Sequence, residues 1–247
     1  MSTGVFTRED FFARAAFSCR LMKKSRYDGI AVIPDIKIKS PAEGALVPPA
    51  DAAGLAAELV KAGAPVISVV TESEHYGGSA ALLEKIAVTV PVPVLRKDFI
   101  RRREQLGESI AMGASAVLLI ASMLDRDLLA HLAEDALALG LEPLVEVHSR
   151  EDIEKARHLD LRLIGINNRN ILELETDSGT VATTERLIKY LPEGIFVVSE
   201  SAVRGPEDVR RAASAGAGAV LVGTAILKAP DPAGMYRELA EALVRHQ

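Results

Sequence analysis

Short apolar runs rich in β-branched residues recur along this 247-residue chain, and their repetition constrains the fold more than any other feature. The eight runs cover residues 30–36, 66–70, 93–95, 116–120, 143–147, 163–166, 195–198 and 219–222. Nearly continuous apolar character is typical of parallel strands that are covered on both faces. We therefore expect these runs to form a parallel β-sheet.

Stretches with a helical spacing of apolar residues separate the runs. The clearest cover residues 51–62, 101–112, 125–139, 151–159 and 206–215. Several end at a glycine suited to a left-handed helix cap, namely Gly63, Gly113, Gly140 and Gly216. Alternating strands and helices predict an α/β fold, either a closed barrel or an open doubly wound sheet. Eight units in a chain of this length favour a single (β/α)8 TIM barrel.

The chain shows no Pro-, Gly- or Ser-rich linker, so we expect one domain over residues 1–247. Within it we expect a short N-terminal helical extension at residues 1–29 and the barrel at residues 30–247. Residues 6–24 carry an apolar stripe at helical spacing. We expect this segment to pack across the bottom or the rim of the barrel.

Composition argues against several other classes of protein. Apolar residues make up 49% of the chain and charged residues 26%, and the net charge of −5 is spread without long like-charge runs. This pattern gives no electrostatic footprint for nucleic acid or for an anionic membrane. No apolar run reaches the roughly 18 residues of a membrane span, and the first ten residues lack a signal-peptide core, so we expect a cytoplasmic protein. Cys19 is the sole cysteine, which excludes a disulfide framework and a cysteine-based metal site.

Polar residues stand where the predicted strands run into the following loops, the place where α/β barrels carry their reactive groups. They are Asp35, Lys37, Lys97, Glu146, His148, Asn167, Arg169, Glu200, Ser201, Gly223 and Thr224. Asp35 and Lys37 are two residues apart, so they should share the inward face of one strand. An unpaired buried charge is costly, and we expect Lys37 or Lys97 to be the partner of Asp35. His148 is expected to be a loop or supporting residue.

The loops after the seventh and eighth strands indicate a phosphate site, because barrels often bind phosphate there. Ser201 and Ala202 occupy the first loop, and Gly223 and Thr224 the second. Gly223 permits close backbone approach and Thr224 offers a hydroxyl. No group of His, Asp and Glu has convincing metal-ligand spacing, the 74–75 Glu-His pair included, so no metal is expected.

Eight segments together resemble the indole-3-glycerol-phosphate synthase family, and they occur in the family's order over most of the chain. The segments are DIKIKSP at 35–41, ISVVTE at 67–72, YGGS at 76–79, VLRKDFI at 94–100, LVEVH at 144–148, IGINNR at 164–169, VSES at 198–201 and LVGT at 221–224. The resemblance implies a lyase of tryptophan biosynthesis that acts on 1-(2-carboxyphenylamino)-1-deoxyribulose 5-phosphate. Such an enzyme closes the indole ring with loss of carbon dioxide and water. The reaction contains no redox step, so no cofactor is expected.

The resemblance also implies roles for the matching residues. Lys97 is the general acid for the ribulose carbonyl, Lys37 holds the substrate carboxylate, and Glu146 carries protons during dehydration. The remaining catalytic positions are Asp35, Asn167 and Glu200, and the substrate-binding positions are Ser40, Phe99, Arg169, Ser201, Ala202, Gly223 and Thr224. A lysine suits an acid role when burial or nearby cations depress its pKa, and we expect this for Lys97.

Three positions depart from the family's usual pattern and leave alternatives open. Asp35 replaces the usual Glu, Ala42 replaces the second serine of a Ser-Pro-Ser loop, and Ala202 replaces the usual Gly. A carboxylate displaced by roughly 1 Å can lower a rate about 100-fold. One alternative is therefore a divergent paralogue acting on another phosphorylated amino-sugar adduct. Another is a non-catalytic barrel that binds a phosphorylated metabolite. The sequence leaves the oligomeric state open.

Overall fold

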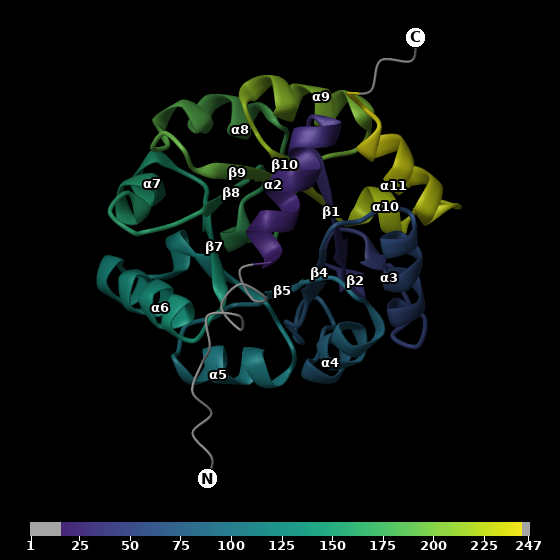
Figure 1. The fold of residues 1–247 in the computed structure, drawn as a ribbon, viewed down its shortest axis with the longest axis horizontal. Helices are drawn as coiled ribbons and strands as arrows, with labels where there is room; N and C mark the ends of the chain where they lie inside the picture. Colours follow the sequence, from purple (N-terminus) through teal and green to yellow (C-terminus); the bar gives the residue numbers. More distant parts are fainter. Residues whose placement is uncertain (1–15, 244–247) are drawn as a thin grey trace.

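The computed structural model describes residues 16–243, and eight parallel strands within them close into a barrel (Figure 1). Around the barrel the strands follow the order β1, β10, β9, β8, β7, β6, β5 and β4, and β4 pairs with β1. Their bounds are β1 Ala31–Ile36, β4 Ile67–Val70, β5 Val94–Lys97, β6 Ala116–Ile120, β7 Glu142–Val147, β8 Leu163–Asn167, β9 Phe196–Glu200 and β10 Ala219–Val222. A hairpin of β2 Lys39–Ser40 and β3 Gly44–Ala45 follows β1. The predicted (β/α)8 barrel is confirmed.

Helices cover the outside of the barrel (Figure 1). Their bounds are α3 Ala52–Lys61, α4 Ala80–Thr89, α5 Glu104–Ala111, α6 Arg126–Ala138, α7 Arg150–Ala156, α8 Ala182–Leu187, α9 Pro206–Ala215, α10 Thr224–Leu227 and α11 Pro232–Ala240, with 3-10 turns at η1 Ala121–Met123, η2 Ile171–Glu173 and η3 Ile188–Tyr190. Helices α4, α6 and α7 begin after Ser79, Asp125 and Ser149, whose side chains accept a backbone N–H of the first turn. These residue types are favoured N-caps because they satisfy an otherwise unpaired donor.

Two apolar cores lie on the two sides of the strands. The inner core holds alternate strand residues, including Ala31, Ile33, Leu95, Leu118, Leu144, Leu163, Val198, Ala219 and Leu221. Intervening residues such as Val32, Val69 and Val117 belong to the outer core under the helices. This alternation follows from the period of two in a strand. Continued to the carboxyl ends of the strands, the inward positions are polar, and there the site is built.

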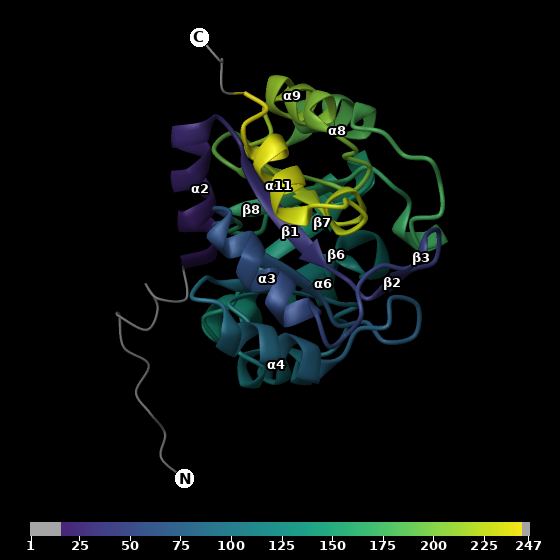
Figure 2. The same cartoon turned by 90° about the vertical axis from the view of Figure 1, so that its right-hand side faces the viewer.

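Helix α2, Ala16–Asp28, closes the end of the barrel at which the strands begin, opposite the β2–β3 hairpin (Figure 2). Phe17 and Leu21 are fully buried and join the inner core. The backbone N–H groups of Phe17 and Ser18 donate to the carboxylate of Glu142, the first residue of β7, at 3.2–3.3 Å. The expected packing across the barrel bottom is confirmed for the described part of the predicted segment, and residues 6–15 lie outside the described residues.

Three strands extend further than their apolar runs predict. β5 ends at Lys97 rather than at residue 95, β8 at Asn167 rather than at residue 166, and β9 at Glu200 rather than at residue 198. The ladder continues because backbone hydrogen bonding is indifferent to side-chain polarity, so that Asn167 pairs with Glu200 and Val70 with Lys97. The polar side chains are therefore held by rigid strands rather than by loops.

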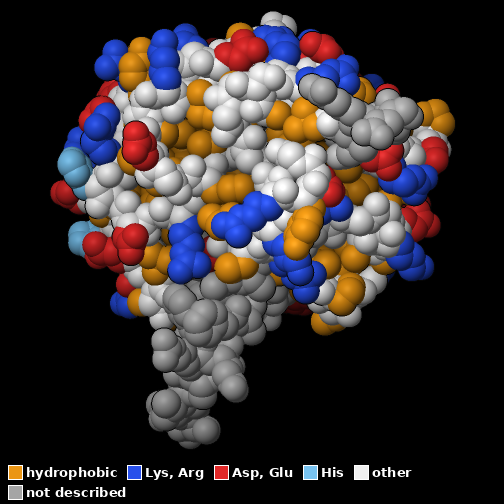
Figure 3. Space-filling model, turned by 45° about the horizontal axis from the view of Figure 1, so that its top comes forward, with side chains coloured by type: hydrophobic (Ala, Val, Ile, Leu, Met, Phe, Trp, Pro, Cys, Tyr) orange, Lys and Arg blue, Asp and Glu red, His pale blue; other side chains and the backbone are white. Residues whose placement is uncertain are grey.

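The outer surface mixes charges of both signs. On the face in Figure 3, basic, acidic and hydrophobic side chains are interspersed. That face offers a polyanion no large patch of one sign, which agrees with the composition. Within residues 16–243, no helix combines the length and the apolar character that crossing a bilayer requires.

Candidate active site

A group of ionisable side chains lies inside the barrel at the carboxyl ends of the strands. Asp35 on β1, Lys97 on β5, Glu146 on β7 and Glu200 on β9 continue the inward register, and Lys37 follows β1 directly. Asp35, Lys37, Glu146 and Glu200 are buried, Glu146 and Glu200 are 0% exposed, and the Lys97 side chain is 11% exposed. Charges are costly to bury, so such a concentration indicates a functional site rather than a structural core.

A glycine on β8 makes room for the Glu200 carboxylate. Gly165 holds an inward position between its register partners Glu146 on β7 and Val198 on β9. A Cβ atom at Gly165 would overlap Oε1 of Glu200. Any other residue would displace the carboxylate, which accounts for a glycine in the middle of a strand.

The Glu146 and Glu200 carboxyl groups have no hydrogen-bond partner among the described residues. Burial and the neighbouring Glu146 raise the pKa of Glu200 well above its usual range, so Glu200 keeps its proton to a higher pH than an exposed glutamate. His148 Nε2 lies 3.2 Å from Glu146 Oε1, outside hydrogen-bond geometry. Burial lowers the pKa of His148, but Glu146 and Asp152 raise it by more. This part of the site can hold and pass protons.

Glu175, in the loop after β8, is a site residue that the sequence analysis missed. Its Oε1 accepts hydrogen bonds from Asn167 Nδ2 at 3.0 Å and from Ser201 Oγ at 2.7 Å, and it lies 4.0 Å from Lys97 Nζ. The residue is 6% exposed although it belongs to a polar loop. No periodicity or strand end marks this position, so the sequence held no signal for it.

Lys97 and Glu175 shift each other's pKa in opposite directions. Burial raises the pKa of Glu175, but Lys97, Lys37 and two hydrogen bonds outweigh it and bring the pKa to about 2. Burial lowers the pKa of Lys97, but Glu175, Asp35 and other carboxylates outweigh it and raise the pKa well above its usual value. The expectation of a depressed pKa for Lys97 is wrong here, because carboxylates rather than cations surround the ammonium group.

Asp35 has a different partner from the expected lysine. Ser68 Oγ donates to Asp35 Oδ1 at 2.6 Å, and no ion pair within 4.0 Å joins Asp35 to a lysine in the described part of the chain. The two residues are register neighbours on β1 and β4. The short arm of aspartate therefore ends beside the adjacent strand.

The larger cavity of the mouth, of about 250 Å³, is rich in cationic side chains. It is lined by Asp35, Lys37, Glu43, Arg169, Glu175, Ser201, Ala202, Val203, Arg204, Leu221, Val222, Gly223, Thr224, Ala225 and Lys228. All the residues predicted to bind phosphate meet here. Charge-assisted donors such as Arg169 and Lys37 suit an oxyanion.

A second cavity of about 20 Å³ shares Asp35, Lys37 and Glu175 with the first. Phe99, Leu118, Ile120 and Ile171 line it together with Lys97 and Glu175. Phe99 is thus placed where an aromatic ring would contact it. Ser40 lines neither cavity and is buried in β2, so its predicted contact with substrate stays a prediction.

Two polar residues beside the site have structural roles. Arg96 ties β5 to α5 through Gln105 O and Ser109 Oγ and also binds Asp98. Asn168 donates to Ser199 Oγ and to the backbone carbonyls of Glu200 and Ser201 at the end of β9. They fix the ends of β5 and β8, where Lys97 and Asn167 lie.

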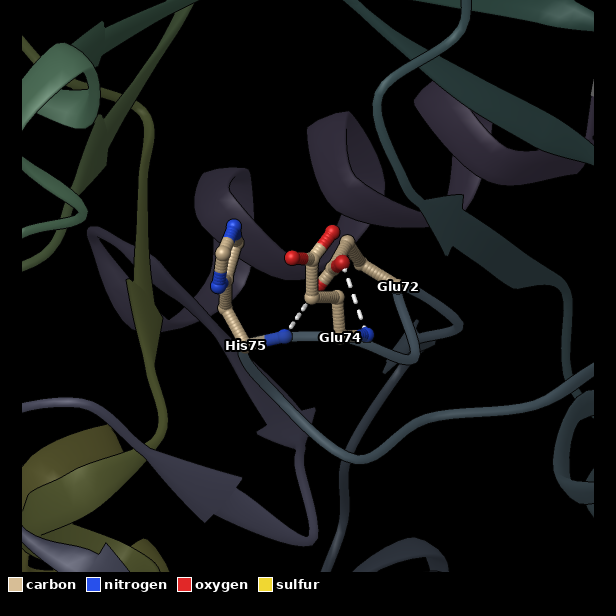
Figure 4. Close-up of side chains that lie close together, drawn as sticks. All are labelled: Glu72, Glu74 and His75. Atoms are coloured by element: carbon tan, nitrogen blue, oxygen red, sulfur yellow. Dashed lines mark hydrogen bonds between the residues drawn. The ribbon is translucent and has the colours of Figure 1, made fainter.

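Glu72, Glu74 and His75 form the one group of described residues with the proximity of metal ligands (Figure 4). The Glu72 carboxylate already accepts the backbone N–H groups of residues 74, 75 and 76 at 2.8–3.0 Å. Its role as a loop cap explains the cluster without an ion.

Comparison with known proteins agrees with this geometry. The family profile described as "Indole-3-glycerol phosphate synthase" matches residues 9–239. The chain is 46% identical over 217 residues to indole-3-glycerol phosphate synthase 1 of Streptomyces coelicolor, covering 88% of this chain and 80% of the relative. It is 42% identical over 235 residues to the synthase of Beutenbergia cavernae, covering 95% and 86%. A Mycobacterium synthase is 40% identical over 222 residues, covering 90% and 80%.

Proposed function

Because this chain belongs to the indole-3-glycerol phosphate synthase family, the decarboxylating lyases of tryptophan biosynthesis, we propose that its barrel mouth carries out ring closure on 1-(2-carboxyphenylamino)-1-deoxyribulose 5-phosphate. The observation that carries the residue assignments is Lys97, which lines the smaller cavity among carboxylates and lies 4.0 Å from Glu175, a residue that lines both cavities. The cationic cavity suits the phosphate end of such a substrate, and Phe99 beside the smaller cavity offers a surface for its aromatic ring.

In this proposal Lys97 donates a proton to the ribulose carbonyl oxygen as the ring carbon attacks the carbonyl carbon. The new carbon–carbon bond forms, and the bond to the carboxylate then breaks to release carbon dioxide and restore the aromatic ring. Loss of the hydroxyl group as water completes the indole. Glu146 takes the proton from the carbon next to the hydroxyl-bearing carbon and delivers it to the hydroxyl, which leaves as water, and Glu200, with its raised pKa, orients this departing water.

The binding assignments rest on the two cavities. Arg169 and the backbone at Gly223 and Thr224 hold the phosphate at the cationic end, and Lys37 holds the substrate carboxylate. Phe99 packs on the aromatic ring at the other end. Asp35 and Asn167 act through Ser68 and Glu175, which they contact.

The proposal also covers the cellular location of the protein, its domain organisation and its need for a cofactor. We place the activity in the cytoplasm, as the relatives named above are bacterial biosynthetic enzymes. We also propose that the chain acts as one domain without a cofactor, since the residues above account for every proton transfer in the reaction.

The decisive experiment is fluorescence-detected formation of indole-3-glycerol phosphate from the authentic substrate. We expect the protein to convert this substrate to indole-3-glycerol phosphate catalytically, with many turnovers per protein molecule. Tight binding of the substrate without product would instead favour a barrel that only binds phosphorylated metabolites. Turnover of a different phosphorylated amino-sugar adduct alone would favour a paralogue.

Replacement of Lys97 tests the acid role directly. Lys97→Ala should lower kcat by about 100-fold or more, because positioned acids contribute about 100- to 10,000-fold. Binding of inorganic phosphate, measured by calorimetry, should be largely kept. Lys61→Ala, at an exposed position on α3, is the matched control and should keep full activity. A Lys97→Ala variant with more than half of the wild-type kcat would remove Lys97 from the mechanism.

A further inference from the structure

Glu175 turns inward from a loop whose neighbouring side chains face solvent. Glu173 and Thr176 are exposed, whereas Glu175 is buried. The inward turn depends on two left-handed backbone residues, Leu174 at φ 53° and Glu175 at φ 56°. Left-handed conformations are unfavourable for residues with a side chain, so the surrounding structure must stabilise this turn.

The facing loop after β9 has the same unusual backbone. Ser201 and Ala202 adopt φ values of 62° and 56°, and within residues 16–243 these two and the pair at 174–175 are the non-glycine residues with positive φ. Ser201 Oγ donates to Glu175 Oε1 at 2.7 Å, which joins the two strained turns. Strained backbone of this kind concentrates at functional sites.

The Glu175 carboxylate is aimed at Lys97. Lys97 Nζ lies 4.0 Å from Glu175 Oε1, and this is its one carboxylate contact within 4.0 Å among the described residues. Asp35 is engaged by the Ser68 hydroxyl instead. Asn167, the last residue of β8, donates from Nδ2 to the same Oε1 at 3.0 Å. The lysine therefore has its nearest counterion on a loop rather than on a strand.

Glu175 also lies at the junction of the two cavities and lines both of them. Under the proposed function, that junction receives the middle of the substrate, between the phosphate and the aromatic ring. The reacting carbonyl group belongs to this middle part. A carboxylate at the junction acts close to the chemistry.

We propose that Glu175 is a positioning residue for Lys97, which holds the ammonium group charged and aimed at the substrate carbonyl. This inference rests on the proposed function, and it assigns to the loop after β8 a part in the acid step. Consistent with it, Glu175 is the strongest of the charges that raise the pKa of Lys97. The other ionisable groups facing Lys97 are Asp35 from β1, Tyr76 from the loop after β4, Glu146 from β7 and Glu200 from β9.

The test uses Glu175→Gln, which keeps an Oε1 acceptor for Asn167 and Ser201 and removes only the charge. We expect kcat to fall about 10- to 100-fold, as for a displaced catalytic group, with little change in KM. The alkaline limb of the kcat/KM profile should move to lower pH by about one unit or more, because a counterion at this distance shifts a pKa by that amount. Glu175→Asp should recover part of the kcat and should return the alkaline limb part of the way toward its wild-type pH.

Controls separate this inference from the proposed function and from misfolding. Glu173→Gln, in the same loop and exposed, should leave the kinetics unchanged, and thermal melts should show every variant folded. A wild type without turnover overturns the proposed function and the inference together. An active wild type with an unmoved alkaline limb in Glu175→Gln overturns the inference alone. A fall in KM with kcat unchanged also overturns it, since Glu175 would then merely occupy the substrate site.

Discussion

Asp35 illustrates how one methylene group redistributes partners within a buried site. Its carboxylate reaches Ser68 and leaves Lys97 to Glu175. A glutamate at position 35 would extend a charge further from β1 into the mouth, where Asp35 already contributes to the raised pKa of Lys97. We therefore expect the carboxylate at position 35 and Glu175 to be energetically coupled.

A double variant tests this coupling. Asp35→Glu in the Glu175→Gln background should recover about 3-fold or more of the lost kcat, because a second carboxylate then supports the ammonium group. Steady-state kinetics of the two single variants and the double variant measure the interaction. Asp35→Ala in the same background is the control and should recover nothing. Equal kcat values for the Glu and Ala versions would show that the carboxylate at position 35 does not reach Lys97.

Ala202 occupies a backbone position that glycine adopts more easily. Its φ of 56° costs a residue with a Cβ atom about 1–2 kcal/mol, whereas glycine adds about 0.4–1 kcal/mol of chain entropy to the unfolded state. Ala202→Gly should therefore raise the free energy of unfolding by up to about 1 kcal/mol. Denaturant titration gives the value. Ala213→Gly, in the middle of α9, should lower it by a similar amount and serves as the contrast.

At the scale of elements, α2 is attached to the barrel by a cap that comes from a distant strand. Glu142 accepts the backbone N–H groups of Phe17 and Ser18 in α2. Glu142→Ala should cost about 1–2 kcal/mol of stability, as for the loss of a strong cap. Hydrogen exchange should accelerate at residues 17–28 before it does in β7. Glu134→Ala, exposed on α6, is the control. Unchanged exchange in α2 would mean that Phe17 and Leu21 alone hold the helix.

The elements also show what the sequence could and could not predict. Apolar runs and glycine caps predict the barrel, and strand ends predict Lys97 and Glu200, because these features depend on local periodicity. The ends of the apolar runs predicted that β5, β8 and β9 stop too early, because the backbone hydrogen bonds of the ladder continue through polar residues. Glu175 and the contact between Glu142 and α2 depend on pairs that are 78 and about 125 residues apart. No local pattern records such pairs.

At the scale of the whole molecule, the barrel has a stabilising end and a functional end. The strand beginnings enclose Phe17, Leu21 and the apolar inner core, whereas the strand ends enclose the buried carboxyl groups. Buried carboxyl groups without partners oppose folding, so the mouth lowers the stability that the rest of the barrel supplies. A substitution that neutralises Glu200, a carboxyl group of the mouth without a hydrogen-bond partner in the described part of the chain, should therefore stabilise the protein while it lowers activity.

The effect of Glu200 on the stability of the folded barrel depends on pH. Its folded pKa is raised, so the folded state binds the proton more tightly than the unfolded chain, whose glutamate pKa is near 4.3. The destabilisation is absent below that value and grows as the pH rises toward the folded pKa.

Glu200→Gln should therefore match the wild-type Tm near pH 4 and exceed it at pH 8 by roughly 2–4 °C, or about 1 kcal/mol. Its kcat should fall by about 10-fold or more. Glu84→Gln, exposed on α4, should leave the Tm difference flat across pH. A Glu200→Gln protein less stable than wild type at pH 8 would show that the carboxylate is stabilised in the folded barrel.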